Sequence, residues 1–201
     1  MVKKPREKKY GICELSKECR ITNLRVHKDD GALAAFLKRD AERYHLEDIA
    51  KTYVFVDQEE EPPRSIVGYI TILNSQILNK DASVAEVGEN YRYYWPAVKI
   101  ARLAVDERWR GCDLGRDLVS FVVALVMKEI APRTGCRFIA VDSNRPAVDF
   151  YKKMGFTLVE TEENLAAETP LMFLDLHKLR LAQLAVGDGA KAAAASAGTA
   201  A

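Results

Sequence analysis

The chain has 201 residues, of which 48% are apolar and 29% are charged, a composition typical of one ordinary globular domain. Thirty basic residues nearly balance 29 acidic ones, and the net charge of +1 excludes binding to nucleic acid or membranes through overall charge. The longest uncharged apolar stretch, residues 118–127, is too short to span a bilayer. Four cysteines without zinc spacing, and no apolar segment behind the basic N-terminus, predict a cytoplasmic protein without a metal site or a membrane partner.

Both ends of the chain are predicted to lie outside the folded domain. Residues 1–10 carry five lysines or arginines against one glutamate, so we expect residues 1–17 to form a flexible basic arm. Residues 187–201 are rich in alanine but lack the apolar periodicity that would dock a helix, which predicts a disordered tail. The folded domain is expected over residues 18–180.

In the first half of the domain the pattern predicts a strand, a helix and a hairpin. Residues 19–26 alternate loosely and favour a strand, and Asp29 or Asp30 can cap a following helix. The apolar residues of that helix recur at helical spacing, at Leu33, Phe36, Leu37 and Ala41. Residues 52–56 and 65–73 are rich in β-branched and aromatic side chains and flank an acidic, proline-containing turn, so they predict the hairpin.

The second half continues the alternation, in the order strand (98–105), helix (113–130), strand (137–141), short helix (146–154) and strand (172–176). Pro146 suits the first turn of the short helix, and Gly155 suits its end. The predicted fold class is α/β, with a mixed, mostly antiparallel central sheet and helices on both of its faces.

The first candidate site lies where the strand ending at Val105 leads into the long helix. A glycine-bearing turn that opens a helix directs several backbone N–H groups and the positive end of the helix dipole at one point, which suits a phosphate. Arg108, Arg110 and Arg116 add positive charge to this turn. Neither the Walker A spacing nor the dinucleotide G-x-G-x-x-G spacing is present. Taken alone, an ordinary turn explains these residues equally well.

The second candidate site follows the strand at residues 137–141. Asn144 comes directly after this strand, and the short helix then carries Phe150 and Tyr151 before a Gly-Phe ending. Phe150 and Phe156 are expected in the core. Tyr151, considered by itself, fits a packed aromatic residue better than a catalyst.

Together the two segments resemble the GNAT superfamily of N-acetyltransferases. Residues 110–115 (RGCDLG) match the register of its cofactor-binding signature, and Asn144 with residues 150–156 (FYKKMGF) matches its second motif at the usual distance. The resemblance covers about residues 19–177. One departure is Asp113, which stands where the signature has its central glycine. Asp113 is expected either to cap the helix with its side chain or to be neutralised by Arg110 and Arg116.

The resemblance implies the GNAT fold, acetyl-CoA as acyl donor and a primary amine as acceptor. It implies that the amine attacks the thioester directly and that Tyr151 protonates the CoA thiolate. The residues expected at the cofactor are Leu103, Ala104, Val105, Arg108, Arg110, Gly111, Cys112, Asp113, Leu114, Gly115, Arg116, Asn144 and Phe150. No general base is evident in the sequence; the candidates are Glu86, Glu89 and Glu107, each of which also fits an ordinary surface carboxylate.

A narrower resemblance, carried by residues 33–41, 51–54 and 100–106, is to the GNAT toxins of bacterial toxin–antitoxin pairs. These acetylate aminoacyl-tRNA and are neutralised by an antitoxin. The acceptor is therefore expected to be a small molecule, a protein or aminoacyl-tRNA, with a homodimer and an antitoxin as further partners. A catalytically silent acyl-CoA-binding module is the main alternative. Aromatic residues between 91 and 95 are expected either in packing or in the wall of the acceptor pocket.

Overall fold

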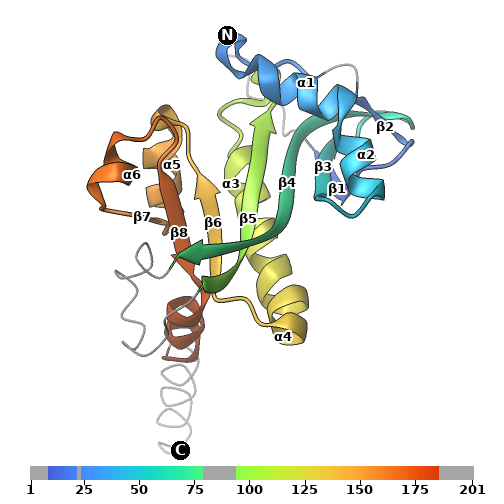
Figure 1. Ribbon diagram of the computed structural model, residues 1–201. Coiled ribbons are helices and arrows are strands. Elements are labelled where there is room, and N and C mark those ends of the chain that lie inside the picture. The colour runs from blue at the N-terminus through green and yellow to red at the C-terminus, as the bar shows by residue number, and fades with distance from the viewer. Residues whose placement is uncertain (1–8, 22–23, 79–93, 186–201) are drawn as a thin grey trace, which may run out of the picture.

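The structure, a computed structural model, describes residues 9–21, 24–78 and 94–185 (Figure 1). The strands are β1 (Tyr10–Glu14), β2 (Cys19–Arg20), β3 (Lys51–Asp57), β4 (Arg64–Leu78), β5 (Tyr94–Val105), β6 (Phe138–Asp142), β7 (Thr157–Leu158) and β8 (Leu171–Asp175). The α-helices are α1 (Gly31–Arg39), α2 (Ala41–Leu46), α3 (Leu114–Leu125), α4 (Ala131–Thr134), α5 (Val148–Lys153), α6 (Glu162–Ala166) and a last helix over 176–185. In the described part of the chain, no helix has the length and apolar character needed to cross a membrane.

The strands form one sheet in the order β1-β3-β4-β5-β6-β8-β7, with β2 beside β4. Neighbours along this order are antiparallel except β5 and β6, which are parallel, as are β2 and β4. The predicted mixed, mostly antiparallel sheet is confirmed. The antiparallel pairing of β3 with β4 confirms the predicted hairpin. β-Branched and aromatic residues, which favour strands, make up much of β3.

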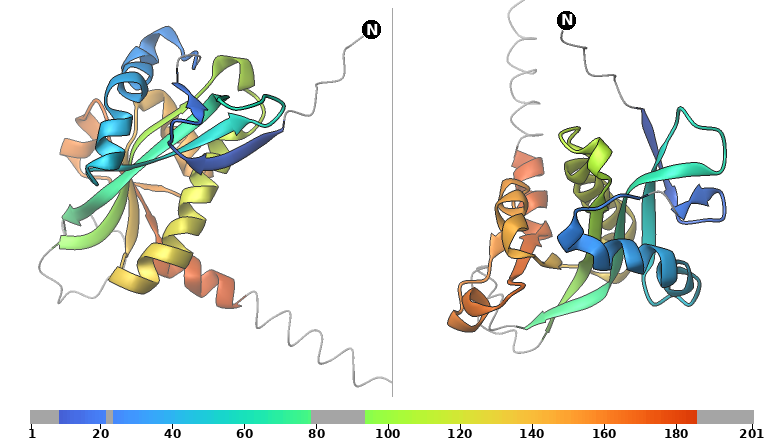
Figure 2. Two further views of the ribbon diagram at one scale, coloured as in Figure 1. Left: turned by 90° about the vertical axis from the view of Figure 1, so that its right-hand side faces the viewer. Right: turned by 90° about the horizontal axis from the view of Figure 1, so that it is seen from above.

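Helices cover both faces of the sheet (Figure 2). On one face, α3 buries Leu114, Leu118 and Val122 against β4 and β5, in the largest apolar cluster of the described residues. On the other face, α1 buries Phe36 and Leu37 in a second cluster with residues of β3 and β4. Helices thus pack against both faces of the sheet, and this packing fixes the positions of β5 and β6.

The structure corrects the predicted boundary of the N-terminal arm. Residues 10–14, expected within a flexible arm, form β1, and every residue of β1 pairs with β3. Tyr10 stacks on Phe55 with 5.1 Å between ring centroids, and its hydroxyl donates to the carboxylate of Asp117 on α3. The abundance of lysine near the N-terminus concealed this strand in the sequence. Residues 1–8 and the tail at 187–201 lie outside the described residues.

Tyr10→Phe is expected to reduce the free energy of unfolding by about 1 kcal/mol at neutral pH, the usual worth of one hydrogen bond. The bond to Asp117 and burial raise the pKa of Tyr10 to about 12. A raised folded-state pKa gives stability that is present below the unfolded value near 10 and lost towards pH 12. The difference between wild type and variant, measured by denaturant unfolding, should therefore fall to zero and then reverse in sign as the pH rises towards 12. A difference that stays constant from pH 8 to pH 12 would contradict this reading.

Other elements differ from the predictions for local reasons. The strand expected at residues 19–26 is reduced to Cys19–Arg20, with residues 22–23 undescribed. Asp30 occupies the N-cap of α1, but its side chain makes no capping bond. The long helix changes from α3 to a π-helical turn at Val126–Ile130 before α4, and β7 and α6 were too short to show any periodicity.

Candidate active site

The strands β5 and β6 are paired over only part of their length. Their register runs from Ala97 opposite Phe138 to Ile100 opposite Val141, whereas β5 continues along β4 as far as Val105. Ala101 has no counterpart in β4, which makes it a β-bulge at the point where the strands separate. Beyond this point the β6 side of β5 meets no other described strand, so its backbone groups are available there to a ligand.

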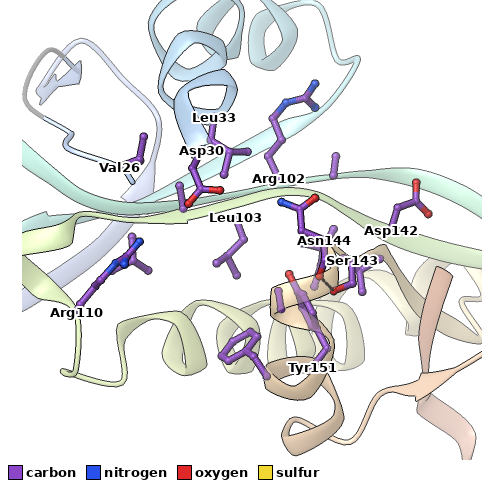
Figure 3. A pocket seen from close by; sticks show the side chains of 17 residues that line it. Val26, Asp30, Leu33, Arg102, Leu103, Arg110, Asp142, Ser143, Asn144 and Tyr151 are labelled. Carbon is purple, nitrogen blue, oxygen red and sulfur yellow. Dashed lines mark hydrogen bonds between the residues drawn. The ribbon is translucent and has the colours of Figure 1, made fainter. Parts of the chain in front are cut away.

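A cleft of about 280 Å³ occupies the gap between the separating strands. Its walls come from the end of β5, the turn after β6, helix α5 and the segment that leads into α1. Figure 3 shows Asp30 and Leu33 on one side of β5 and Tyr151 on the other, with the Leu103 side chain towards Tyr151. Both expected motifs therefore meet at one cavity, together with a third segment.

A second cavity, of about 260 Å³, lies at the N-terminus of α3 and shares Val105, Arg110 and Phe150 with the cleft. Its lining residues are Val105, Trp109, Arg110, Gly111, Asp113, Leu114, Gly115, Arg116, Phe150, Lys153 and Met154. Gly111 has a φ of +78°, which side chains disfavour, and a Cβ there would meet no atom within 4 Å. The backbone conformation of the turn is therefore what calls for glycine at this position.

The second cavity is suited to an anion. The first backbone N–H groups of α3 have no partner within the helix, and the helix dipole adds positive potential at the same place. Arg110, Arg116 and Lys153 line the cavity and are exposed. Lys153 was not predicted, since nothing in its local sequence indicated that α5 would bring it to the start of α3. The arrangement fits a pyrophosphate.

Asp113 sits in the left-handed region with a φ of +54°, directly before α3. Its side chain makes no capping hydrogen bond, so the capping explanation is wrong. The other expectation, that Arg110 and Arg116 neutralise Asp113, holds for Arg116, because a guanidinium nitrogen of Arg116 lies 3.8 Å from a carboxylate oxygen of Asp113. Both side chains are largely exposed, and an ion pair of this kind contributes little to stability. Asp113 therefore remains an unfavourable charge beside the anion cavity.

Asp113→Gly is expected to leave the free energy of unfolding within about 1 kcal/mol of wild type, because glycine relieves the left-handed strain but loses more chain entropy. Removing the carboxylate should leave the affinity for CoA unchanged or raise it, since two like charges repel across the cavity. Denaturant unfolding and calorimetric titration with CoA measure the two effects. A large loss of CoA affinity would show that the aspartate contributes to binding.

Two predicted cofactor residues are placed elsewhere. The guanidinium of Arg108 is bound to the carboxylate of Asp106 at 2.7 and 2.8 Å and lines a different cavity, beside Asp57 and Glu60. The Cys112 side chain is exposed and lies on neither wall. Arg108 was predicted at the cofactor because it adds a positive charge to the turn. Its guanidinium instead points away from the anion cavity, because it is bound to the buried carboxylate of Asp106.

Tyr151 is buried to 5% exposure on α5, packed edge-on against Phe150 and Phe156. Within the described residues its hydroxyl has no hydrogen-bond partner, and it lines the cleft opposite β5 (Figure 3). Burial raises the pKa of Tyr151 above its usual range, so the phenol is protonated at neutral pH. Asn144 lines the same cleft, at the turn that follows β6.

Several residues of the cleft were not predicted from the sequence. They are Val26, Asp30, Leu33, Ile100, Ala101, Arg102, Val141, Asp142, Ser143 and Ala147. The first three come from a segment about seventy residues before the first motif, so only the tertiary fold brings them to β5. The guanidinium of Arg102 lies 4.1 Å from the ring centroid of Phe36, an arrangement that fixes the α1 side of the cleft.

The candidate general bases are not supported. Glu107 is exposed on a 3-10 helix outside the cleft, and Glu86 and Glu89 lie outside the described residues. The carboxylates that do line the cleft are Asp142, which pairs with Lys99, and Asp30. No group of three or more His, Cys, Asp or Glu in the described ranges is arranged to hold a metal ion. Trp95 packs against Phe138 at 6.2 Å and lines neither cavity.

Comparison with known proteins agrees with this geometry. Residues 12–156 match the Acetyltransferase (GNAT) family. A structure of AtaT complexed with acetyl-methionyl-tRNAfMet superimposes with a TM-score of 0.71 at 23% identity, covering 86% of this chain and 98% of that one. A bacterial toxin gives a TM-score of 0.75 at 14% identity, with coverages of 88% and 96%. A phenylalanine mutant of KacT gives a TM-score of 0.71 at 23% identity, with coverages of 86% and 98%.

A strand that separates from its parallel neighbour, beside a helix N-terminus suited to an anion, is consistent with an acyl-CoA-dependent transferase. The chain belongs to the acetyltransferase (GNAT) family, and the enzyme class predicted from its sequence, an acetyl-CoA-dependent acetyltransferase, is confirmed. The solved structures, at such low identity, establish the common fold alone.

Proposed function

We propose that this protein transfers the acetyl group of acetyl-CoA directly to a primary amine, with Tyr151 as proton donor to the departing sulfur. The observation that carries the proposal is the Tyr151 hydroxyl, which lacks a partner in the described chain and faces the gap between β5 and β6. The ring of Tyr151 is buried but its hydroxyl opens into the cleft, so a group bound there can accept its proton.

The cofactor would lie across both cavities. The pyrophosphate fits the N-terminus of α3, and the pantetheine arm would follow the open edge of β5. The residues assigned to it are Leu103, Ala104, Val105, Arg110, Gly111, Asp113, Leu114, Gly115, Arg116, Asn144 and Phe150. Arg108 is withdrawn from this set because its guanidinium is bound to Asp106, and Cys112 is kept for its backbone N–H alone, because its side chain lines neither cavity.

The reaction then follows from the chemistry of a thioester. The amine nitrogen attacks the carbonyl carbon, and the oxygen gains negative charge that backbone N–H groups along the open edge of β5 stabilise. The carbon–sulfur bond breaks, and the sulfur takes a proton from Tyr151. The proton lost by the attacking nitrogen compensates for the proton that the phenol gives up.

Tyr151 is suited to this role although its pKa is high. A CoA thiol has a pKa near that of cysteine, about 8.5, so the phenol is the weaker acid. Its hydrogen bond therefore strengthens as negative charge develops on sulfur and stabilises the transition state more than the ground state. The raised pKa also returns the proton to the phenol before the next turnover.

For the acceptor we favour aminoacyl-tRNA over a small molecule or a protein. AtaT, which shares the fold, is described in complex with acetyl-methionyl-tRNAfMet. The segment before α1 and α1 itself line one side of the cleft, where we place the acceptor. These elements also carry the exposed cations Arg25, Lys28, Lys38 and Arg39. A local basic surface can bind phosphates even though the net charge of the protein is only +1.

The test is an acetyl-transfer assay with labelled acetyl-CoA and total aminoacyl-tRNA. The expected result is label on the aminoacyl group that RNase releases from the large RNA fraction, and no label with deacylated tRNA. Label on protein or small amines, unaffected by RNase, would sink the tRNA assignment and keep the enzyme. A rise in melting temperature with acetyl-CoA but no transfer to any acceptor would identify a silent binding module instead.

Further partners belong to the same proposal. AtaT is described bound to the C-terminus of the antitoxin AtaR, and KacT in a KacTA–DNA complex. By this likeness we include an antitoxin among the partners, and we keep the cytoplasmic location expected from the sequence. A homodimer remains a prediction, to be measured as the mass of the protein in solution.

A further inference from the structure

Asp106, the residue directly after β5, is fully buried although it carries a charge. Its carboxylate accepts four hydrogen bonds. One oxygen accepts from the backbone N–H and the Nε of Arg108 at 2.9 and 2.8 Å. The other accepts from the backbone N–H of Arg25 at 2.9 Å and from the Arg108 guanidinium at 2.7 Å. Such a saturated carboxylate holds each donor in a defined position.

These bonds join three separate segments of the chain. The backbone of Arg25 is held twice, because its carbonyl also accepts from the N–H of Glu107 at 2.8 Å. The N–H of Asp106 donates to the carbonyl of Val67 on β4 at 2.8 Å. The segment at Arg25 and the turn that leads to α3 therefore meet at the Asp106 carboxylate, and the backbone of the same residue is held by the central sheet.

Two of the joined segments lead directly to a wall of the site. Val26, the neighbour of Arg25, lines the cleft, and the same segment continues to Asp30. On the other side the turn from Glu107 continues to Arg110 and Gly111 at the anion cavity. Burial alone would raise the pKa of Asp106, but the bonds from Arg108 and Arg25 lower it overall, so the carboxylate is charged at neutral pH.

We propose that Asp106 is a positioning residue for acetyl-CoA, whose carboxylate fixes the anion-binding turn relative to the N-terminal wall of the cleft. This rests on the proposed cofactor site. The carboxylate touches neither cavity, and Arg108 acts with it as the side chain that locks the turn. Arg108 thus contributes to cofactor binding indirectly, by holding the turn in place.

The test compares Asp106→Asn with Asp175→Asn. Asp175 is a matched control, since it is also buried and accepts from Arg137 at 2.8 Å and from two backbone N–H groups, but it lines neither cavity of the site. Both variants should melt at lower temperature. Only Asp106→Asn should raise the calorimetric Kd for acetyl-CoA and its KM, by about tenfold, with kcat at saturation within about twofold of wild type. Should Asp106→Asn fail to fold, Arg108→Gln, which keeps the two backbone N–H bonds, should raise the same constants about threefold.

The outcomes separate the two proposals. If wild type fails to bind acetyl-CoA, the proposed cofactor site is overturned and this inference with it. If wild type binds and Asp106→Asn binds equally well, or Asp175→Asn loses as much affinity, Asp106 is only a structural residue. If Arg108→Gln is the variant measured, an affinity equal to that of wild type would likewise show that the Asp106–Arg108 pair is only structural.

Discussion

Tyr151→Phe is expected to lower kcat about 10²–10⁴-fold while the KM for acetyl-CoA changes little. The ring is retained, so its contacts with Phe150 and Phe156 persist and only the proton donor is removed. A thiolate is a tolerable leaving group near neutral pH, which favours the lower end of this range. Initial rates with the acceptor found in the acetyl-transfer assay, or acetyl-CoA hydrolysis as a substitute, measure the effect.

Tyr53→Phe is the matched control for this substitution. Tyr53 is a half-buried tyrosine on β3 that packs edge-on against Phe121, 5.0 Å between centroids, and lines neither cavity. Its variant should keep wild-type kcat. If Tyr151→Phe turns over at more than half the wild-type rate, Tyr151 is a packing residue and water or another group protonates the sulfur.

Arg110→Glu is expected to raise the Kd for acetyl-CoA at least tenfold, or about 1.4 kcal/mol. Arg110 lines both cavities and is exposed, so the change reverses a charge near the phosphates with little effect on the core. The loss should shrink at high salt, because an exposed charge is screened. Calorimetric titration at two salt concentrations measures both effects.

Arg133→Glu makes the same change of charge on α4, where Arg133 pairs with Glu129 outside both cavities. Its affinity for acetyl-CoA should equal that of wild type. Equal losses in the two variants would indicate a general effect of net charge, and no loss in Arg110→Glu would remove that residue from the site.

Local sequence predicted the elements whose periodicity is complete within one segment. The hairpin of β3 and β4 and helix α3 were correct because β-branched runs and helically spaced apolar residues need no distant information. β1 was missed because its pairing partner is about forty residues away and its neighbours are lysines. β5 is longer than predicted, since Trp95 and Pro96 do not resemble a strand without β4 beside them.

The candidate site was predicted where motif and geometry coincide, and missed where tertiary contacts decide. Tyr151 and the open edge of β5 meet in one cleft, as expected from the two motifs. The position of the Arg108 side chain was not foreseen, because the burial of its partner Asp106 cannot be read from a sequence in which both are simply charged residues two positions apart. Asp30 and Lys153 were missed because they arrive from elements that carry no motif.

The most direct test of the central claim is a crystal structure of the protein with acetyl-CoA. We expect the pyrophosphate at the backbone N–H groups between Gly111 and Arg116, and the thioester sulfur within hydrogen-bond distance, about 3.5 Å, of the Tyr151 hydroxyl. The thioester carbonyl should lie against the open edge of β5. Acetyl-CoA bound outside both cavities, or a sulfur far from Tyr151 with another donor beside it, would contradict the account.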